Sequence, residues 1–115
     1  MKFVEAVIQP HHLTAVLAAL ERVNVERLTV LDGHSHRQPE RHRDEHFGGW
    51  PGASMLRQVI LEIVVNDDFL ERTLEAIRNA ARSGPLGREG DGKIFVLPVA
   101  ETVQIGGTDR GPGAV

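Results

Sequence analysis

The tetrapeptide Gly90-Asp91-Gly92-Lys93 contains the residue types that can bind a phosphate group. Glycines have no Cβ and so let backbone N–H groups approach phosphate oxygens closely, while the lysine adds a positive point charge. A Gly-Asp-Gly turn before a strand is more often only a turn. The motif alone therefore does not predict a binding site.

Histidines form a second group of residues with possible chemistry. His34, His36, His42 and His46 all occur in the polar segment 33–54. The spacing of His34 and His36 could present two imidazoles to a metal ion. A nearby carboxylate could then complete the coordination of the metal. Histidines in exposed loops are usually solvated, so metal binding through this pair is kept as the alternative hypothesis.

The elements that must position these residues follow from the hydrophobic pattern. Segments 2–9, 27–32, 55–66 and 93–99 read as strands, with helices over about 12–23 and between Asp68 and Gly84. Segment 33–54 is expected to be a long flexible loop, 102–105 a short fifth strand and 106–115 a loose tail. The order β-α-β-β-α-β is typical of the ferredoxin-like α+β fold, and the 115 residues are expected to form one domain.

The strand around 59–65 is apolar on both faces. Val59, Leu61, Ile63 and Val65 alternate with Ile60 and Val64, yet two helices can cover only one face of a sheet. A homo-oligomer would cover the other face. The alternative is that the C-terminal tail folds back over it.

Composition narrows the classes of function. Without cysteine, the chain has no disulfide, no thiolate metal site and no cysteine nucleophile. A net charge of −3 argues against nucleic-acid binding, which depends on clustered positive charge. Neither a signal peptide nor an apolar run long enough to enter a membrane is visible, so we expect a cytoplasmic protein. No catalytic constellation can be assembled on rigid elements, which argues against an enzyme.

The segment from Gly90 to Ile105 resembles the C-terminal signature of PII signal-transduction proteins. The starting MKFVEAVIQP, segment 28–33 and segment 59–68 resemble the corresponding parts of that family. The resemblance implies a non-enzymatic homotrimer that binds adenine nucleotides in clefts between subunits. It also implies a loop that contacts a regulated enzyme or transporter.

The resemblance assigns roles to particular residues. It implies that Thr29 and Val64 hold the adenine ring and that Arg37 reaches the phosphates from the loop. The glycine-rich turn, with Gly87 and the 90–93 motif, would bind the phosphates.

Departures from the family pattern predict a changed ligand preference. Two family arginines that reach the phosphates correspond to Gln104 and Gly106, and the turn is lengthened around Arg88 and Glu89. Without these arginines the protein loses two charge-assisted hydrogen bonds, and the affinity for ATP, the most highly charged ligand, should fall most. ADP or AMP is therefore expected to bind at least as well as ATP. Arg88 and Arg110 could compensate.

Other departures concern regulation. The chain has no tyrosine, which excludes control by nucleotidylation of a loop tyrosine, and Gln58 replaces the lysine that helps to hold 2-oxoglutarate. The losses are compatible with a carboxysome-associated branch thought to respond to ADP or AMP with bicarbonate. The histidines would instead suit a branch that accompanies heavy-metal efflux systems.

Overall fold

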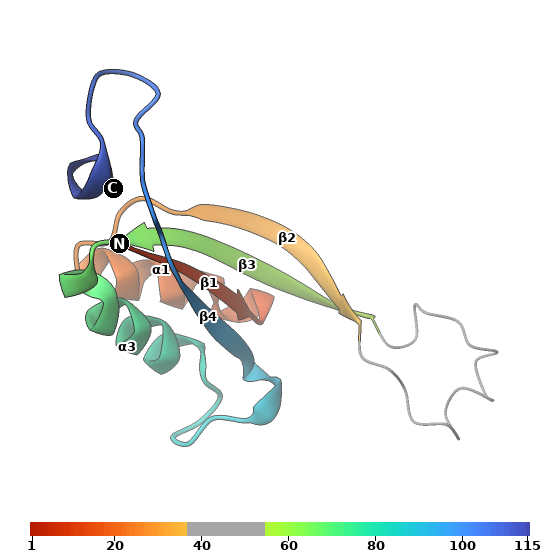
Figure 1. Ribbon diagram of the computed structural model, residues 1–115. Helices are drawn as coiled ribbons and strands as arrows, with labels where there is room; N and C mark the ends of the chain where they lie inside the picture. The colour runs from red at the N-terminus through yellow and green to blue at the C-terminus, as the bar shows by residue number, and fades with distance from the viewer. Residues whose placement is uncertain (37–54) are drawn as a thin grey trace.

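A computed structural model describes residues 1–36 and 55–115, which form a four-stranded sheet with two helices against one face (Figure 1). The strands lie in the order β2-β3-β1-β4 and all neighbours are antiparallel. The ferredoxin-like α+β fold is thereby confirmed. The elements are β1 (Lys2–Ile8), α1 (Leu13–Arg22), β2 (Thr29–His36), β3 (Met55–Val65), α3 (Leu70–Ala81) and β4 (Gly92–Pro98).

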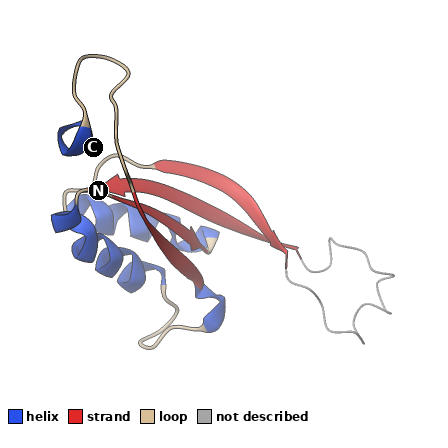
Figure 2. Cartoon of the chain, viewed as in Figure 1, coloured by secondary structure: helices blue, strands red, loops and turns tan. Residues whose placement is uncertain are grey.

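The core lies between the sheet and the two helices, which Figure 2 shows as separate layers. Successive side chains of a strand point to opposite faces, so alternate residues of β1 and β3 share the helix side of the sheet. Helical spacing brings Val16 and Leu20 of α1, and Ile77 and Ala81 of α3, against them. The buried strand residues are Val4, Ala6, Ile8, Val59, Leu61, Ile63 and Val65.

Strand β2 is longer than the hydrophobic pattern predicts. It continues past Asp32 to His36, with Gly33 opposite Gln58 and His34 opposite Arg57. These residues are polar and only partly covered, so backbone pairing with β3 holds them in the strand rather than burial. The predicted loop therefore begins at least four positions later than 33, and from residue 37 onward it lies outside the described residues.

The C-terminal segment is more ordered than expected. The predicted strand 102–105 reduces to a single bridge between Val103 and Arg110. The backbone N–H of Gly111 donates to the carbonyl of Thr102 at 2.7 Å, so the tail returns on itself. The Asn66 side chain then donates to the carbonyl of Pro112 at 3.1 Å. The expectation of a loose tail is wrong, because local hydrogen bonds hold residues that have no core to enter.

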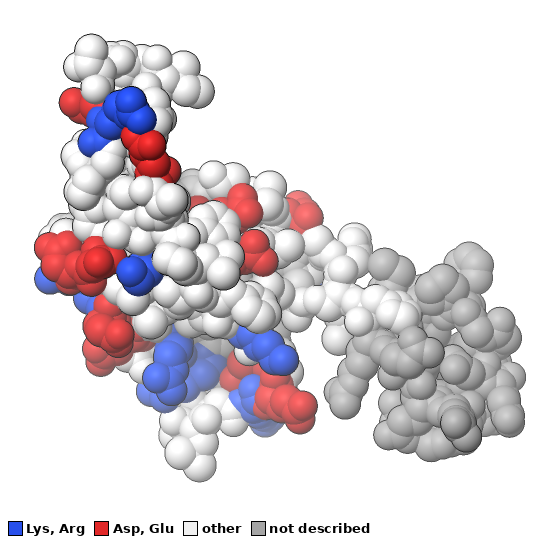
Figure 3. Space-filling model, viewed as in Figure 1, with Lys and Arg blue, Asp and Glu red and all other residues white. Residues whose placement is uncertain are grey.

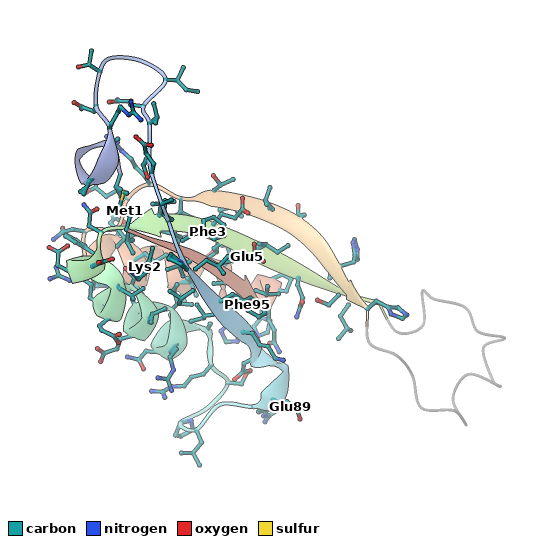
Figure 4. The ribbon with its side chains drawn as sticks, in the orientation of Figure 1. Met1, Lys2, Phe3, Glu5, Glu89 and Phe95 are labelled. Carbon is teal, nitrogen blue, oxygen red and sulfur yellow. The ribbon has the colours of Figure 1, made fainter. Side chains whose placement is uncertain are left out.

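The outer face of the sheet, opposite the helices, stays largely apolar and uncovered. Phe95 is 50% exposed and Leu97 is 54% exposed. Figure 4 labels Phe3 and Glu5 of β1 and Phe95 of β4, which belong to this face by the strand register. The tail is hydrogen-bonded to Asn66, just after the end of β3, and it leaves Phe95 and Leu97 exposed on this face. Three cross-strand rows make up the outer face: Leu97, Phe3 and Val64; Phe95, Glu5, Glu62 and Thr29; Lys93, Val7, Ile60 and Leu31.

Candidate functional site

The turn between α3 and β4 is closed by the carboxylate of Asp91. Its Oδ2 accepts hydrogen bonds from the backbone N–H groups of Ser83 at 2.7 Å and Arg88 at 2.8 Å. Its Oδ1 accepts one from the Ser83 hydroxyl at 2.6 Å. Asp91 therefore positions the residues of its own turn. Sequence reasoning missed Ser83, although a serine at a helix end and an aspartate later in the same turn is a usable signal.

The hydrogen bonds also fix the charge of Asp91. The Ser83 hydroxyl, and then the backbone N–H groups of Ser83 and Arg88, lower the pKa of Asp91 from 3.8 to about 2. An ionised carboxylate accepts stronger hydrogen bonds than a neutral one. The turn is consequently held closed by a charged residue at neutral pH.

Two glycines are required by the shape of the turn. Gly87 has φ +74°, and a Cβ there would lie 3.2 Å from the Cβ of Arg82. Gly92 has φ +129°, and a Cβ there would lie 1.9 Å from the backbone oxygen of Val7. The carbonyl of Gly90 accepts a hydrogen bond from the Gln9 side chain at 2.9 Å, which ties the turn to the end of β1. These contacts place Lys93 at the start of β4.

An open cleft of about 550 Å³ lies between this turn, the end of α3 and the start of β4. Its lining includes the acidic residues Glu89 and Asp91 and four positively charged residues: Arg78, Arg82, Arg88 and Lys93. Figure 3 shows Lys and Arg side chains gathered near this end of the molecule, with acidic side chains between them. In the parts of the chain that the structure describes, none of the four cations forms an ion pair. The cleft is therefore suited to an anion.

The sequence pointed to the glycine turn but missed the helix side of the cleft. Gly87, Asp91, Gly92 and Lys93 all line it, and Gly90 lies in the same turn. Arg78 and Arg82 also line it, from the last turn of α3 and the residue after it. Their spacing of four on a helix that leads into a glycine-rich turn was the available signal.

Thr29 and Val64 lie apart from this cleft. Both belong to the outer face of the sheet, Thr29 on β2 opposite Glu62 and Val64 on β3 opposite Phe3. Strands β2 and β4 form opposite edges, separated by three strand spacings or about 14 Å. One chain thus brings the turn residues together but does not bring Thr29 beside them.

His34 and His36 lie on the same face of β2, two positions apart. Asp32 precedes them on that face, but its carboxylate pairs with Arg57, whose nitrogen lies 3.2 Å away. Among residues 1–36 and 55–115, no three His, Cys, Asp or Glu side chains are grouped closely enough to hold a metal ion. The two histidines therefore form a pair without a third ligand in the described structure.

Comparison with known proteins identifies the family. The family described as "Nitrogen regulatory protein P-II" matches residues 1–108. The chain is 38% identical to nitrogen regulatory protein GlnK1 of Methanosarcina mazei, across all of this chain and 97% of that protein. It is 37% identical to nitrogen regulatory protein P-II of Azospirillum brasilense, across the full length of both. The chain belongs to the P-II family.

A solved structure supports the same assignment. The crystal structure of Arabidopsis thaliana PII bound to citrate matches with a TM-score of 0.77 and 31% identity, covering 99% of this chain and 91% of that one. P-II proteins are regulatory signalling proteins, and the fold of this chain agrees with that membership. No helix in the described segments has the length and apolar character needed to span a membrane.

The C-terminal segment of this P-II chain brings no arginine to its own cleft. Gln104 and Gly106 are exposed, and the guanidinium of Arg110 is paired with Glu101, the Nε lying 2.7 Å from the carboxylate. Arg110 does not line the cleft, so compensation by this residue within one chain is not supported. Arg37, the remaining predicted phosphate contact, lies outside the described residues.

Proposed function

We propose that this P-II protein is a non-enzymatic regulator that binds adenine nucleotides, with ADP or AMP favoured over ATP. The nucleotide would occupy clefts between the subunits of a homotrimer. Its binding would change how the loop after β2 engages a regulated enzyme or transporter. Membership of a family of regulatory proteins supports the general function, and the cleft beside Lys93 supports the ligand class.

The observation that carries this proposal is the braced turn at the cleft. Asp91 fixes the backbone of Ser83 and Arg88, while Gly92 lets β4 begin against Val7. A preformed turn with cationic side chains does not have to be ordered when an anion binds, so less conformational entropy is lost. Lys93 would contact the phosphates as a compact positive charge.

The position of Thr29 and Val64 supports a site shared between subunits. A ligand held by the turn and by both of these residues must lie across the outer face of the sheet or between two copies of the chain. Phe95 and Leu97 are uncovered on that face, and packing against other subunits would bury them. The adenine ring would then be enclosed where one chain alone leaves the face open.

The preference for ADP or AMP follows from the C-terminal segment. The family resemblance implies phosphate-binding arginines at the positions of Gln104 and Gly106, which carry no charge in this chain. ATP carries the most charge and gains most from such arginines, so their loss reduces its advantage. Bicarbonate is proposed as a second small anion beside the nucleotide, bound with help from the arginines of the loop.

Calorimetric titration tests the proposed function directly. The wild-type protein should bind ADP or AMP at least as tightly as ATP with magnesium, and Lys93→Ala should weaken ADP at least about tenfold. Lys2→Ala is the matched control, because it removes the only other lysine, which pairs with Asp67 away from the cleft. Tenfold tighter binding of ATP than ADP would contradict the preference, and unchanged ADP binding by Lys93→Ala would contradict the site.

The same titration tests the second effector. With pH and ionic strength held constant, bicarbonate should tighten ADP binding, and ADP should tighten bicarbonate binding by the same factor. Equal ADP affinities with and without bicarbonate would remove bicarbonate from the proposal. Tight zinc or copper binding that is lost in His34→Ala and His36→Ala would support a metal-responsive P-II protein instead.

A further inference from the structure

We infer that Arg88 and Arg82 form an arginine pair that binds the second phosphate of the nucleotide and supplies part of the charge that the C-terminal segment lacks. This inference rests on the proposed nucleotide function and adds the residues that set its dependence on phosphate number. It also gives a function to the residues around Arg88 and Glu89, which make this turn longer than the family pattern.

The backbone of Arg88 is held in place despite its position in an exposed turn. Its N–H donates to Asp91 at 2.8 Å, and it adopts an extended conformation before the 3-10 turn Glu89–Asp91. Glu89 lies at the base of β4 in Figure 4. The Arg88 side chain lines the cleft together with Lys93. An anchored backbone fixes the point at which the Arg88 side chain leaves the turn, so no loop entropy is lost when its guanidinium binds a ligand.

Arg82 approaches the same cleft from the end of α3. A Cβ at Gly87 would meet the Cβ of Arg82 at 3.2 Å and its Cδ at 3.9 Å, so the arginine stem lies against the bare backbone of Gly87. The guanidinium donates to Asn79 Oδ1 at 2.9 Å, which leaves most of its donors for a ligand. The Arg82 stem therefore lies against the turn that also contains Arg88, and both arginines line the cleft.

The charges around the pair favour an anion of more than one negative charge. Asp91 is engaged within the turn, which leaves Glu89 as the acidic lining residue without a hydrogen-bond partner among those described. Opposing it are Arg78, Arg82, Arg88 and Lys93. Guanidinium groups bind phosphate oxygens through paired N–H donors, which a lysine cannot do. The second phosphate is therefore assigned to the arginines.

The test compares nucleotides that differ only in phosphate number. Arg88→Ala and Arg82→Ala should each weaken ADP at least about tenfold while changing AMP affinity less than about threefold. Arg88→Lys should bind ADP more tightly than Arg88→Ala but less tightly than wild type, because lysine keeps the positive charge but lacks the paired N–H donors of a guanidinium. Arg22→Ala is the matched control, since Arg22 is an exposed arginine at the end of α1 that does not line the cleft. Circular dichroism should show that each variant is folded.

The outcomes separate this inference from the proposed function. If wild-type protein binds ADP and both Arg88→Ala and Arg82→Ala bind it equally well, the arginine pair is wrong and the nucleotide function stands. If Arg110→Ala weakens ADP and these two variants do not, the charge comes from the C-terminal segment of another subunit, and the inference is also overturned. If wild-type protein binds no adenine nucleotide, the proposed function fails and the inference fails with it.

Discussion

The charge on Asp91 links the closed turn to pH. Its pKa of about 2 lies below the ordinary value of 3.8, so the ionised form stabilises the folded protein at pH values above about 4. That stabilisation is lost as the pH falls from about 4 through 2. Asp91→Asn should therefore be less stable than wild type at neutral pH, and the difference should shrink in this range. Urea unfolding at a series of pH values measures it.

A control separates this aspartate from acid unfolding in general. Asp68→Asn removes an exposed carboxylate that accepts no hydrogen bond from another described residue. It should leave the pH dependence of stability close to that of wild type. A constant stability difference between wild type and Asp91→Asn from pH 6 to 2 would contradict the role assigned to the Asp91 carboxylate.

Gly92 is restricted by a clash as well as by its dihedral angle. An alanine Cβ would lie 1.9 Å from the backbone oxygen of Val7, so β1 and β4 would have to separate. We expect Gly92→Ala to lower the free energy of unfolding by more than about 2 kcal/mol. Gly84→Ala is the comparison, because φ is +71° but nothing lies within 4 Å, and it should cost about 1 kcal/mol. Equal costs in denaturant titrations would show that β4 can move.

At the scale of elements, α3 connects the core to the cleft. Ile77 is 1% exposed, belongs to the core and also lines the cleft. Ile77→Ala should cost about 2–5 kcal/mol because it opens a cavity that the helix and sheet cannot fill. Ile105→Ala, at a fully exposed position, should change stability little. A cost for Ile77→Ala below about 1 kcal/mol, measured by urea unfolding, would mean that α3 repacks.

Elements with a strong apolar pattern were the ones that the sequence predicted well. Strands β1 and β3 and both helices have a periodic apolar pattern that matches their buried faces. The end of β2 was missed because Gly33–His36 pairs with β3 without entering the core, and its polar residues read as loop. The order of the tail was missed for the same reason, since it depends on backbone hydrogen bonds. At the site, the glycine motif could be recognised in the sequence. The role of Asp91 in bracing the turn could not, because it depends on hydrogen bonds from Ser83, eight positions earlier in the chain.

At the scale of the whole molecule, the apolar outer face predicts assembly. Phe95 lies on the edge strand β4, in the middle one of the three cross-strand rows of this face, and is 50% exposed in the single chain. Phe95→Glu should convert the proposed trimer into smaller species at micromolar concentration, because a charge would be buried without a partner. Sedimentation equilibrium measures the change. Ala15→Glu puts the same charge on the exposed side of α1 and should leave the assembly intact. A wild-type protein that sediments as a stable monomer would overturn the trimer.

The strand order also affects how the chain folds while it is being synthesised. Strand β1 is made early but lies between β3 and β4, and Ile8 does not meet its partner Gly92 until almost the whole sheet has been synthesised. Contacts between residues so distant in sequence form slowly. Until β4 arrives, one edge of β1 stays open, and an open apolar strand edge can pair with another chain. The same strand that completes the sheet also carries Lys93, so a nascent chain lacks its cleft during the interval in which it is most prone to aggregate.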